Sequence, residues 1–313
     1  MLNNKKKHAV CCFVFGIVAT VMLVVGLCQT LVAAEVKQKG FKSPEEAVQA
    51  LAEAVKGDNT KELMAIFGPA SKELIFSGDT VADKTGRGRF TKAYEEKHTL
   101  VKEGDRKVIL VVGKNDWPLP IPLVKEGEQW RFNTPVGKEE ILNRRIGKNE
   151  LNAIKVCLAY VDAQREYALK DRDGNKVREY AQRFVSTPGK HDGLYWQTKE
   201  EEVPSPMGPL AAKAANEGYV RINLSPYHGY YYKILKAQGE HARGGAYSYA
   251  VNGKMFGGFA LVACPAEYGN SGIMTFVVNH DGVVYQKDLG KGTEKIVEAM
   301  TKYDPDQTWQ KTK

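Results

Sequence analysis

The apolar residues in the first third of the chain follow helical spacing and then strand spacing. Ser43 precedes a proline and is followed three residues later by Glu46, which is the pattern of a capped helix start. Apolar side chains then recur every three or four positions until Gly57. The pattern predicts three helices, over 44–56, 61–67 and 90–96, with a glycine-containing loop at 86–89 before the third.

Four short runs rich in Val, Leu, Ile and aromatic residues follow these helices. Turn sequences such as Glu-Gly-Asp and Glu-Gly-Glu separate the runs, which predicts strands over 99–102, 107–112, 119–124 and 129–133. Helices followed by an antiparallel meander make an α+β domain. The order of these elements, with Trp130 in the last strand, resembles the cone-shaped nuclear transport factor 2-like fold, and this resemblance implies that fold for residues 35–147.

A longer helical stripe begins at Asn149 and predicts that the second half of the chain opens with a helix. The stripe ends near Asp171, and its apolar residues share one face. These residues are Leu151, Ile154, Cys157, Leu158, Val161 and Ala168. Tyrosine- and glycine-rich strands follow, in which Asp281-Gly282 predicts a hairpin turn. A short amphipathic helix is predicted over 293–302.

Two stretches of the second half resemble type IV pilin-like proteins. The helix from Asn149 to Ala168 is similar to the pilin helix, and the segment from Pro265 to Val283 is similar to the pilin ending of two strands and an Asp-Gly turn. The resemblance implies a pilin-like α+β domain over 148–313, in which the helix packs across a small antiparallel sheet. This helix follows a polar domain, however, whereas a pilin helix begins inside an apolar membrane segment.

The pilin-like arrangement also implies a disulfide between Cys157 and Cys264. A helix packed in this way would cover the strand that holds Cys264, and the two side chains would approach to bridging distance. The remaining three cysteines, Cys11, Cys12 and Cys28, lie in the N-terminal segment. Disulfides persist in the oxidising compartments that exported proteins reach.

The last third of the chain carries the most specific resemblance. The segments 227–232, 257–269 and 274–290 are dense in aromatic residues and glycine, and they are similar to the conserved block of a bacterial exported family known as domain of unknown function 2950. The resemblance is strongest from Tyr227 to Trp309. It implies a family, but it implies no activity, cofactor or catalytic residue.

The N-terminal segment has the three parts of a secretory signal. Three lysines precede an almost wholly apolar run over 9–27, and Val-Ala-Ala at 32–34 supplies a cleavage site before Glu35. We therefore expect a signal peptide over 1–34 and a protein that is periplasmic or secreted. An apolar run of about 20 residues is also long enough to span a bilayer, so an uncleaved inner-membrane anchor is the alternative.

The charge pattern argues against one class of partner. Loss of residues 1–34 removes three of the 45 basic residues and none of the 37 acidic ones, which leaves a net charge of +5. Charges of both signs are interspersed in segments such as 199–202, as on a solvated surface. A nucleic-acid interface would instead gather basic residues on one face. We expect no nucleic-acid partner.

Two loops suggest ion binding but lack the complete motifs. The sequence over 171–175 contains two aspartates and a glycine, yet Leu169 and Tyr180 occupy two ligand positions of an EF-hand loop. A turn that ends the preceding helix explains the same residues. The glycines over 239–245 lack the lysine and the helix that follow a phosphate loop.

Two further groups suggest catalysis. Three histidines with Cys264 suggest a metal or nucleophile site, but their spacing matches no ligand motif. The histidines are His228, His241 and His280. Glu267 and Asp288 suggest a carboxylate pair for glycan hydrolysis. We expect no metal and no cofactor, and the spacing favours a protein without catalytic activity.

Tyrosines are frequent in the last third of the chain. Each combines an apolar ring with a hydroxyl, which suits a partly wet recognition surface. We predict a binding face made of Tyr227, Tyr230, Tyr232, Tyr247, Tyr249, Tyr268 and Tyr285. The alternative is that these tyrosines close the core of a small sheet domain.

Together these patterns predict an exported, non-enzymatic binding or structural module of the cell envelope, with an envelope protein or polysaccharide as its partner. A cell-wall or polysaccharide-processing enzyme that uses acidic residues beside a tyrosine-rich groove is one alternative. A pilus-like assembly subunit is another, and it requires an exposed apolar stripe on the helix from Leu151 onward. Membrane contact is expected only if the N-terminal segment is not cleaved.

Overall fold

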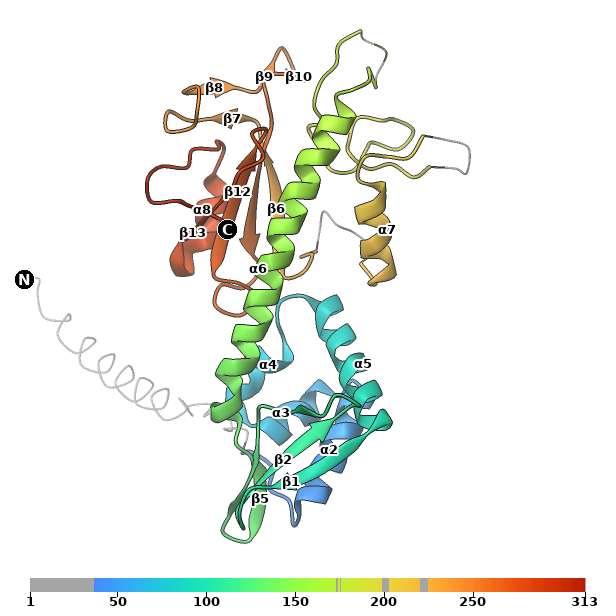
Figure 1. Cartoon of the computed structure of the whole chain (residues 1–313), viewed down its shortest axis with the longest axis vertical. Coiled ribbons are helices and arrows are strands. Elements are labelled where there is room, and N and C mark those ends of the chain that lie inside the picture. The colour runs from blue at the N-terminus through green and yellow to red at the C-terminus, as the bar shows by residue number, and fades with distance from the viewer. Residues whose placement is uncertain (1–36, 173, 175, 199–202, 220–224, 313) are drawn as a thin grey trace, which may run out of the picture. The chain divides into compact units, whose positions relative to one another are not determined.

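Helices and antiparallel sheets make up the chain, which therefore has an α+β architecture (Figure 1). This computed structural model describes residues 37–172, 174, 176–198, 203–219 and 225–312. The segment predicted to be a signal peptide, 1–34, lies outside the described residues. The α+β class predicted from the sequence is confirmed.

The first two helices, α2 (Pro44–Lys56) and α3 (Thr60–Phe67), form where their pattern predicts them. Ser43 Oγ accepts a hydrogen bond from the backbone N–H of Glu46 at 3.1 Å. The Glu46 carboxylate in turn accepts one from the N–H of Lys42 at 2.8 Å. This reciprocal capping box satisfies two backbone donors at the start of α2 and so fixes where the helix begins.

The third helix, α5 (Thr80–Glu96), is longer than its pattern predicts. Glycine costs about 1 kcal/mol relative to alanine in a helix interior, and the glycines at 86 and 88 therefore favoured a loop. The helix starts earlier because the Asp79 carboxylate accepts a hydrogen bond from the N–H of Ala82 at 2.9 Å. Between α3 and α5 lie a 3-10 turn, Pro69–Ser71, and α4 (Lys72–Ile75).

Five antiparallel strands form the first sheet, which α2, α3 and α5 contact. They are β1 (His98–Lys102), β2 (Lys107–Val112), β3 (Trp117–Pro118), β4 (Leu123–Glu126) and β5 (Gln129–Phe132). The order is β1-β2-β4-β5, and β3 also pairs with β2. Val108, Leu110 and Val112 alternate along β2 and are buried, so β2 has one core face. The strand expected over 119–124 forms only from Leu123 onward.

A single helix of 34 residues, α6 (Thr134–Tyr167), leads out of the first sheet. It starts at Thr134 rather than at the predicted Asn149, with Pro135 in its first turn, where proline suits a helix. Gly137 lets α6 pack directly against the backbone of Pro120, because a Cβ at this position would overlap the proline carbonyl. The helix crosses the predicted boundary between the two domains without a break.

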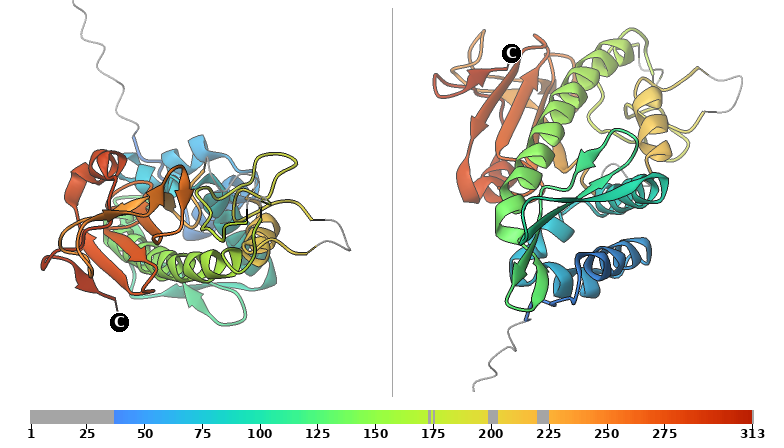
Figure 2. Two further views of the ribbon diagram at one scale, coloured as in Figure 1. Left: turned by 90° about the horizontal axis from the view of Figure 1, so that it is seen from above. Right: turned by 60° about the horizontal axis from the view of Figure 1, so that its bottom comes forward.

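Helix α6 packs along the second sheet, as both views of Figure 2 show. This sheet has five antiparallel strands in the order β14-β13-β12-β11-β6. They are β6 (Tyr230–Leu235), β11 (Ala260–Pro265), β12 (Met274–Asn279), β13 (Val284–Asp288) and β14 (Gln310–Lys311). Every residue of β11 is buried, as in a central strand covered on both faces. The predicted turn at Asp281-Gly282 joins β12 to β13.

Shorter elements complete the described chain. They are α7 (Gly208–Asn216), the ribbon of β7 (Ala237–Gln238) with β8 (Tyr247–Ser248), the ribbon of β9 (Ala250–Val251) with β10 (Lys254–Met255), a 3-10 turn (Gly290–Gly292) and α8 (Thr293–Ala299). Helix α8 contacts β11 of the second sheet. The C-terminal helix predicted from the sequence therefore forms and covers the sheet.

The described residues form two large hydrophobic cores and a smaller cluster of Val156, Ala214, Tyr219 and Tyr227. One large core lies among α2, α3 and the first sheet, and the other among α6, the second sheet and the segments around it. We call residues 37–133 the first lobe and residues 168–312 the second lobe. Ile141 of α6 packs against the first core, whereas Ala153 and Tyr160 belong to the second. Helix α6 is therefore a structural part of both lobes.

The predicted disulfide between Cys157 and Cys264 is not formed, and both side chains are buried free thiols. Cys157 lies on α6, which packs near Tyr232. In the pairing of β11 with β6, Tyr232 lies opposite Ala263, and Cys264 is the next residue along β11. Successive residues of a strand point to opposite faces, so the Cys264 side chain lies on the other face of the sheet from Tyr232. Lys233 shares that opposite face, and its Nζ donates to the carbonyl oxygen of Val297 in α8 at 3.1 Å. Burial raises the pKa of Cys157 to about 12 and that of Cys264 to about 11.

Replacing either of two glycines in α6 by alanine should change the stability of the protein, in opposite directions. Gly137→Ala should lower the free energy of unfolding by about 1–3 kcal/mol, because the new Cβ meets the rigid backbone of Pro120. Gly147→Ala should raise it by about 0.5–1 kcal/mol, because nothing lies within 4 Å of the new Cβ and alanine favours the helix. Urea unfolding of both variants measures the two effects. Equal effects would show that α6 does not pack closely on Pro120.

Candidate functional site

A cavity of about 660 Å³ lies among α2, α3, α4, α5, α6, residues 213–219 and His228. Small-molecule sites typically measure about 300–1,000 Å³. Its floor consists of the buried side chains Leu51, Val55, Leu63, Ile75, Leu119 and Ile121. Its basic rim consists of Arg87, Arg89, Arg144, Arg145, Lys148 and Lys213. The cavity therefore combines an apolar interior with a positively charged opening.

Helical spacing explains why these side chains meet. The polar residues of α6 that line the cavity lie three or four positions apart and so share one helix face. They are Arg144, Arg145, Lys148, Asn149 and Asn152. Helix α5 contributes Asp83, Gly86 and Phe90 in the same way, one turn apart from each other. Helix α6 therefore presents a polar face to the apolar floor, and α5 presents a face with both polar and apolar residues.

Three of the rim cations already have partners within the chain. Arg87 Nε lies 2.6 Å from Asp58 Oδ1, and Arg144 pairs with Glu140 one turn away on α6. Arg145 donates to backbone carbonyls of the first lobe. These interactions use up much of the hydrogen-bonding capacity of the three side chains.

The other three rim cations have no such partner. Within the described part of the chain, no ion pair or hydrogen bond involves the side chain of Arg89, Lys148 or Lys213. Burial and the positive charge of Arg89 lower the pKa of Lys148, although Glu217 opposes this shift. Two cations therefore repel each other at the cavity, and the Glu217 carboxylate offsets only part of this repulsion. A bound anion would relieve this repulsion.

Asp83 is the acidic group on the cavity side of α5. Its carboxylate accepts a hydrogen bond from the N–H of Ser77 at 3.0 Å. Burial raises the pKa of Asp83, while that hydrogen bond and the charges of Arg145 and Arg87 oppose the rise. Asp83 therefore interacts with Ser77 and with two of the rim arginines.

His228 forms a constrained corner of the cavity. Its φ angle of +52° is in the left-handed region, where a residue other than glycine is uncommon. Its Nε2 lies 3.3 Å from Glu217 Oε2, and its ring packs against that of Tyr227 at 4.1 Å. Burial lowers the pKa of His228, an effect that the Glu217 carboxylate opposes. The imidazole is therefore held in one orientation at the edge of the site.

The same corner is anchored by a buried carboxylate. Asp79 is 1% exposed, and its Oδ2 accepts hydrogen bonds from the hydroxyl of Tyr219 at 2.8 Å and from the N–H of Gly229 at 2.9 Å. Its Oδ1 accepts the bond from Ala82 that caps α5. One carboxylate thus joins the start of α5 to the backbone next to His228, and it fixes two walls of the cavity together.

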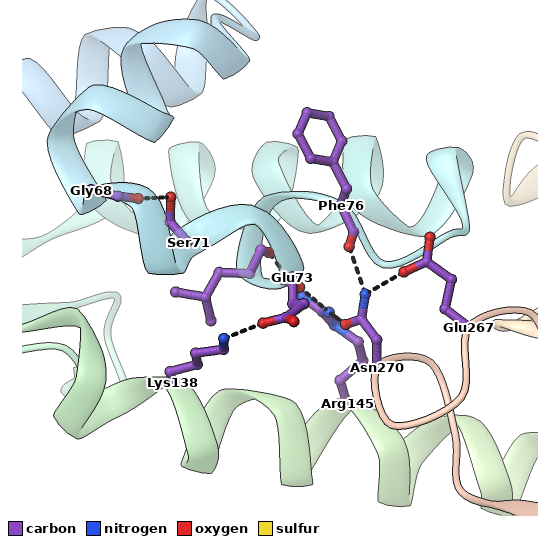
Figure 3. Close-up of polar contacts among 9 residues, drawn as sticks. Gly68, Ser71, Glu73, Phe76, Lys138, Arg145, Glu267 and Asn270 are labelled. Carbon is purple, nitrogen blue, oxygen red and sulfur yellow. Dashed lines mark hydrogen bonds and ion pairs between the residues drawn. The ribbon is translucent and has the colours of Figure 1, made fainter. Parts of the chain in front are cut away.

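A second polar cluster joins the lobes beside the cavity (Figure 3). Arg145 donates to the carbonyl oxygens of Glu73 at 2.6 Å and Leu74 at 2.9 Å, and also to the side-chain oxygen of Asn270. Asn270 donates to the carbonyl oxygen of Phe76 at 2.8 Å. It also donates to the carboxylate of Glu267 at the same distance. Arg145 therefore has a structural role in addition to lining the cavity.

The seven predicted tyrosines do not form one exposed face. Tyr227, Tyr230 and Tyr249 have at most 1% of their surface exposed and belong to the hydrophobic clusters. They are buried because α6 and the loops around it cover this end of the second sheet. Tyr232, Tyr268 and Tyr285 are partly buried, and Tyr247 is 38% exposed. A binding role for the tyrosines that reach solvent remains a prediction.

The two candidate acids of the second lobe are held by neighbouring groups. Glu267 accepts the bond from Asn270 described above. Asp288 accepts hydrogen bonds from the hydroxyl of Tyr268 at 3.2 Å and from the N–H of Gly290 at 2.7 Å. These contacts position both acids and give neither an evident role in chemistry.

The histidines of the predicted Cys-His group lie in different surroundings. His228 borders the cavity, His241 Nδ1 lies 3.1 Å from the carboxylate of Asp304, and the ring of His280 contacts Tyr249. Within the described ranges, no three His, Cys, Asp or Glu side chains are grouped to hold a metal ion.

The two loops considered for ions are closed by their own hydrogen bonds. The Asp171 carboxylate accepts bonds from the N–H groups of Gly174 and Lys176, the pattern of a turn. Gln238 Nε2 donates to the carbonyl oxygens of Arg243 and Gly245. These bonds account for the shape of both loops.

The residues that make the cavity polar are not marked by any local sequence motif. Arg89, Lys148, Lys213 and Glu217 come from three segments that are far apart in sequence. One local signal was present, because Arg145, Lys148 and Asn152 lie at helical spacing before and after the predicted helix start. Extending the helix toward the N-terminus would have shown this polar face.

Comparison with known proteins identifies the family. The chain belongs to the family described as protein of unknown function, DUF2950, whose model matches residues 38–312. The predicted family is thus confirmed. No curated protein and no solved structure matches the chain. The likeness of the two lobes to nuclear transport factor 2 and to pilins therefore remains a prediction.

Across the residues that the structure covers, none of the helices is both long enough and apolar enough to cross a bilayer.

Arg145 and Arg144 provide a matched pair of variants. Arg145→Lys should lower the free energy of unfolding by about 2–4 kcal/mol, because an ammonium cannot serve the two carbonyls and the amide that the guanidinium joins. Arg144→Lys should change it by less than about 0.5 kcal/mol, since its ion pair is exposed. Chemical denaturation measures both. A small effect of Arg145→Lys would mean that the polar cluster contributes little to stability.

His228 and His241 should titrate on opposite sides of the ordinary pKa of 6.5. Burial depresses the pKa of His228, whereas the hydrogen bond with Asp304 raises that of His241. The unfolded chain therefore binds a proton at position 228 more readily than the folded chain does. The contribution of His228 to stability is present at pH values above its ordinary pKa. It is lost as the pH falls from the ordinary pKa to the lower pKa of His228 in the folded chain.

NMR titration of the two imidazoles measures both shifts. His228→Asn, which tolerates a positive φ, should remove the contribution of this site to the loss of stability on acidification. A midpoint for His228 above that of His241 would contradict the burial of its ring.

Proposed function

We propose that this protein is an exported, non-enzymatic binding module of the cell envelope, and that its cavity holds a small anionic ligand. The observation that carries the proposal is the group of rim cations, Arg89, Lys148 and Lys213, that have no partner among the described residues. All three side chains are exposed at the cavity and have no ion pair of their own in the described part of the chain, so they are free to attract and contact an anion there. The cavity is therefore suited to an anion.

Export is supported by the N-terminal sequence. The lysine-led apolar run and the Val-Ala-Ala ending are those of a signal peptide, with Glu35 as the first residue of the mature protein. The binding module would then act in the periplasm or outside the cell. An intact N-terminus in the membrane fraction would instead indicate an anchored form.

Charge geometry supports recognition of a carboxylate or phosphate group. Arg89 offers a planar guanidinium for two hydrogen bonds, and Lys148 adds a compact positive charge from the opposite helix. Hydrogen bonds to charged groups contribute about 1.5–3 kcal/mol each. Two such contacts account for a large part of micromolar affinity, which corresponds to about 8 kcal/mol.

Assembly through α6 is the second candidate function. Leu151 and Leu158 lie two turns apart on α6 and are 62% and 42% exposed. This is the kind of apolar stripe that a pilus-like subunit would use. The stripe is short, and an interface between subunits normally buries about 1,200 Å² or more. Assembly is therefore the weaker candidate, and self-association of the purified protein at high concentration would favour it.

The enzyme alternative has less support from the contacts described above. Glu267 is tied to Asn270 and Asp288 to Tyr268, so each acid already has a hydrogen-bonding partner. A carboxylate that acts as a general acid normally has a raised pKa in an apolar pocket. We therefore favour binding over polysaccharide processing.

Native mass spectrometry and calorimetry test the proposed function. Protein recovered from its own envelope should carry a small anionic molecule, and the double variant Arg89→Met, Lys148→Met should lose it. Affinity should fall by at least about tenfold, because both charge-assisted contacts are removed. Lys155→Met is the control, since Lys155 is an exposed cation on the same helix outside the cavity. Equal loss in the control variant, or binding of no anion by the native protein, would contradict the proposal.

A further inference from the structure

The apolar floor of the cavity indicates the nature of the rest of the ligand. All lining residues that come from α2, α3 and residues 119–121 are apolar. Beyond the six floor side chains, Phe67, Leu74, Phe90 and Ile141 also line the cavity and pack against the first core. The interior therefore continues the hydrophobic core of the first lobe.

A polar molecule would not suit this interior. Its hydroxyl or amide groups would lose their hydrogen bonds to water and find no partner on the apolar walls, which is costly. Apolar cavities instead stay dry and accept hydrocarbon. Phosphate alone, a sugar phosphate or a nucleotide would leave the floor unused or would bury polar groups against it.

We propose that the cavity binds a single-chain amphiphilic anion, with its hydrocarbon chain against the floor and its carboxylate or phosphate group at Arg89 and Lys148. This inference rests on the proposed function, because it uses the same cations for the head group. A fatty acid and a single-chain phospholipid share this chemistry. The apolar interior and the unpaired cations are the two observations that carry it.

The position of Gly86 supports a ligand that passes close to α5. Gly86 lies between Asp83 and Phe90 on the cavity side of the helix. A Cβ at Gly86 would meet only the Arg89 guanidinium within 4 Å, at 3.9 Å. The glycine thus leaves open space in the wall next to the proposed head group, and a larger side chain would project into this space.

Binding of a homologous series tests the inference. Alkanoates and alkyl phosphates of six to twelve carbons, used below their micelle concentrations, are titrated into the full-length protein after bound molecules are removed on a hydrophobic resin. Each added pair of methylene groups should tighten binding by about fifteenfold until the cavity is full. The head group that gives the tighter binding at equal chain length identifies the source of the anion.

Two glycine variants of α5 locate the chain. Gly86→Leu should weaken binding of the twelve-carbon ligand by about tenfold or more, because the leucine takes up space for at least two methylene groups. Binding of the six-carbon ligand should weaken as well, because Gly86 lies next to the proposed head group. Gly88→Leu is the matched control, since a Cβ at Gly88 meets nothing within 4 Å and Gly88 does not line the cavity. Thermal unfolding of both variants checks that α5 is intact.

The outcomes separate this inference from the proposed function. Binding of phosphate or short anions that depends on Arg89 and Lys148 but not on chain length would overturn the inference and leave the proposed function standing. Equal effects of Gly86→Leu and Gly88→Leu would also overturn it. Failure of anions of every length to bind would overturn both.

Discussion

The continuity of helix α6 is the constraint on which the rest of the structure depends. Because α6 packs against the core of the first lobe near Ile141 and belongs to the second core from Ala153 onward, neither lobe is complete without it. The stretch between those positions carries Arg145 and Lys148, so the polar side of the cavity lies where the helix passes from one core to the other. The same turns of α6 therefore connect the two lobes and supply the charged wall of the cavity.

Local sequence signals predicted the elements whose ends are fixed by local chemistry. The capping box at Ser43 and the Asp281-Gly282 turn form as expected, because each satisfies its hydrogen bonds or its φ angle within a few residues. Helix α5 was underestimated because its two interior glycines oppose helix formation. Its cap at Asp79 also accepts hydrogen bonds from the second lobe, a long-range contribution that helical propensity does not include.

The candidate site was less predictable than the fold, since a cavity is defined by residues that are distant in sequence. Leu51, Arg89, Lys148 and Lys213 line one space, yet no pair of them lies within one local motif. The pilin-like resemblance implied that the helix packs on the second sheet but did not determine which sheet face each strand residue occupies, and Cys264 therefore faced the wrong way for a disulfide. The tyrosine pattern likewise identified strands without showing which rings the surrounding chain would cover.

The contact between Asp79 and the N–H of Gly229 has a consequence for the order of folding. These residues are separated by 150 positions, so the N-cap of α5 gains this partner only after most of the chain is available. Contacts of such long range form slowly, because a large loop must close first. A chain that is synthesised from its N-terminus onward would hold an unfinished first lobe until its last third arrives. The cavity is therefore assembled late, and a chain truncated before residue 229 would be unable to complete it.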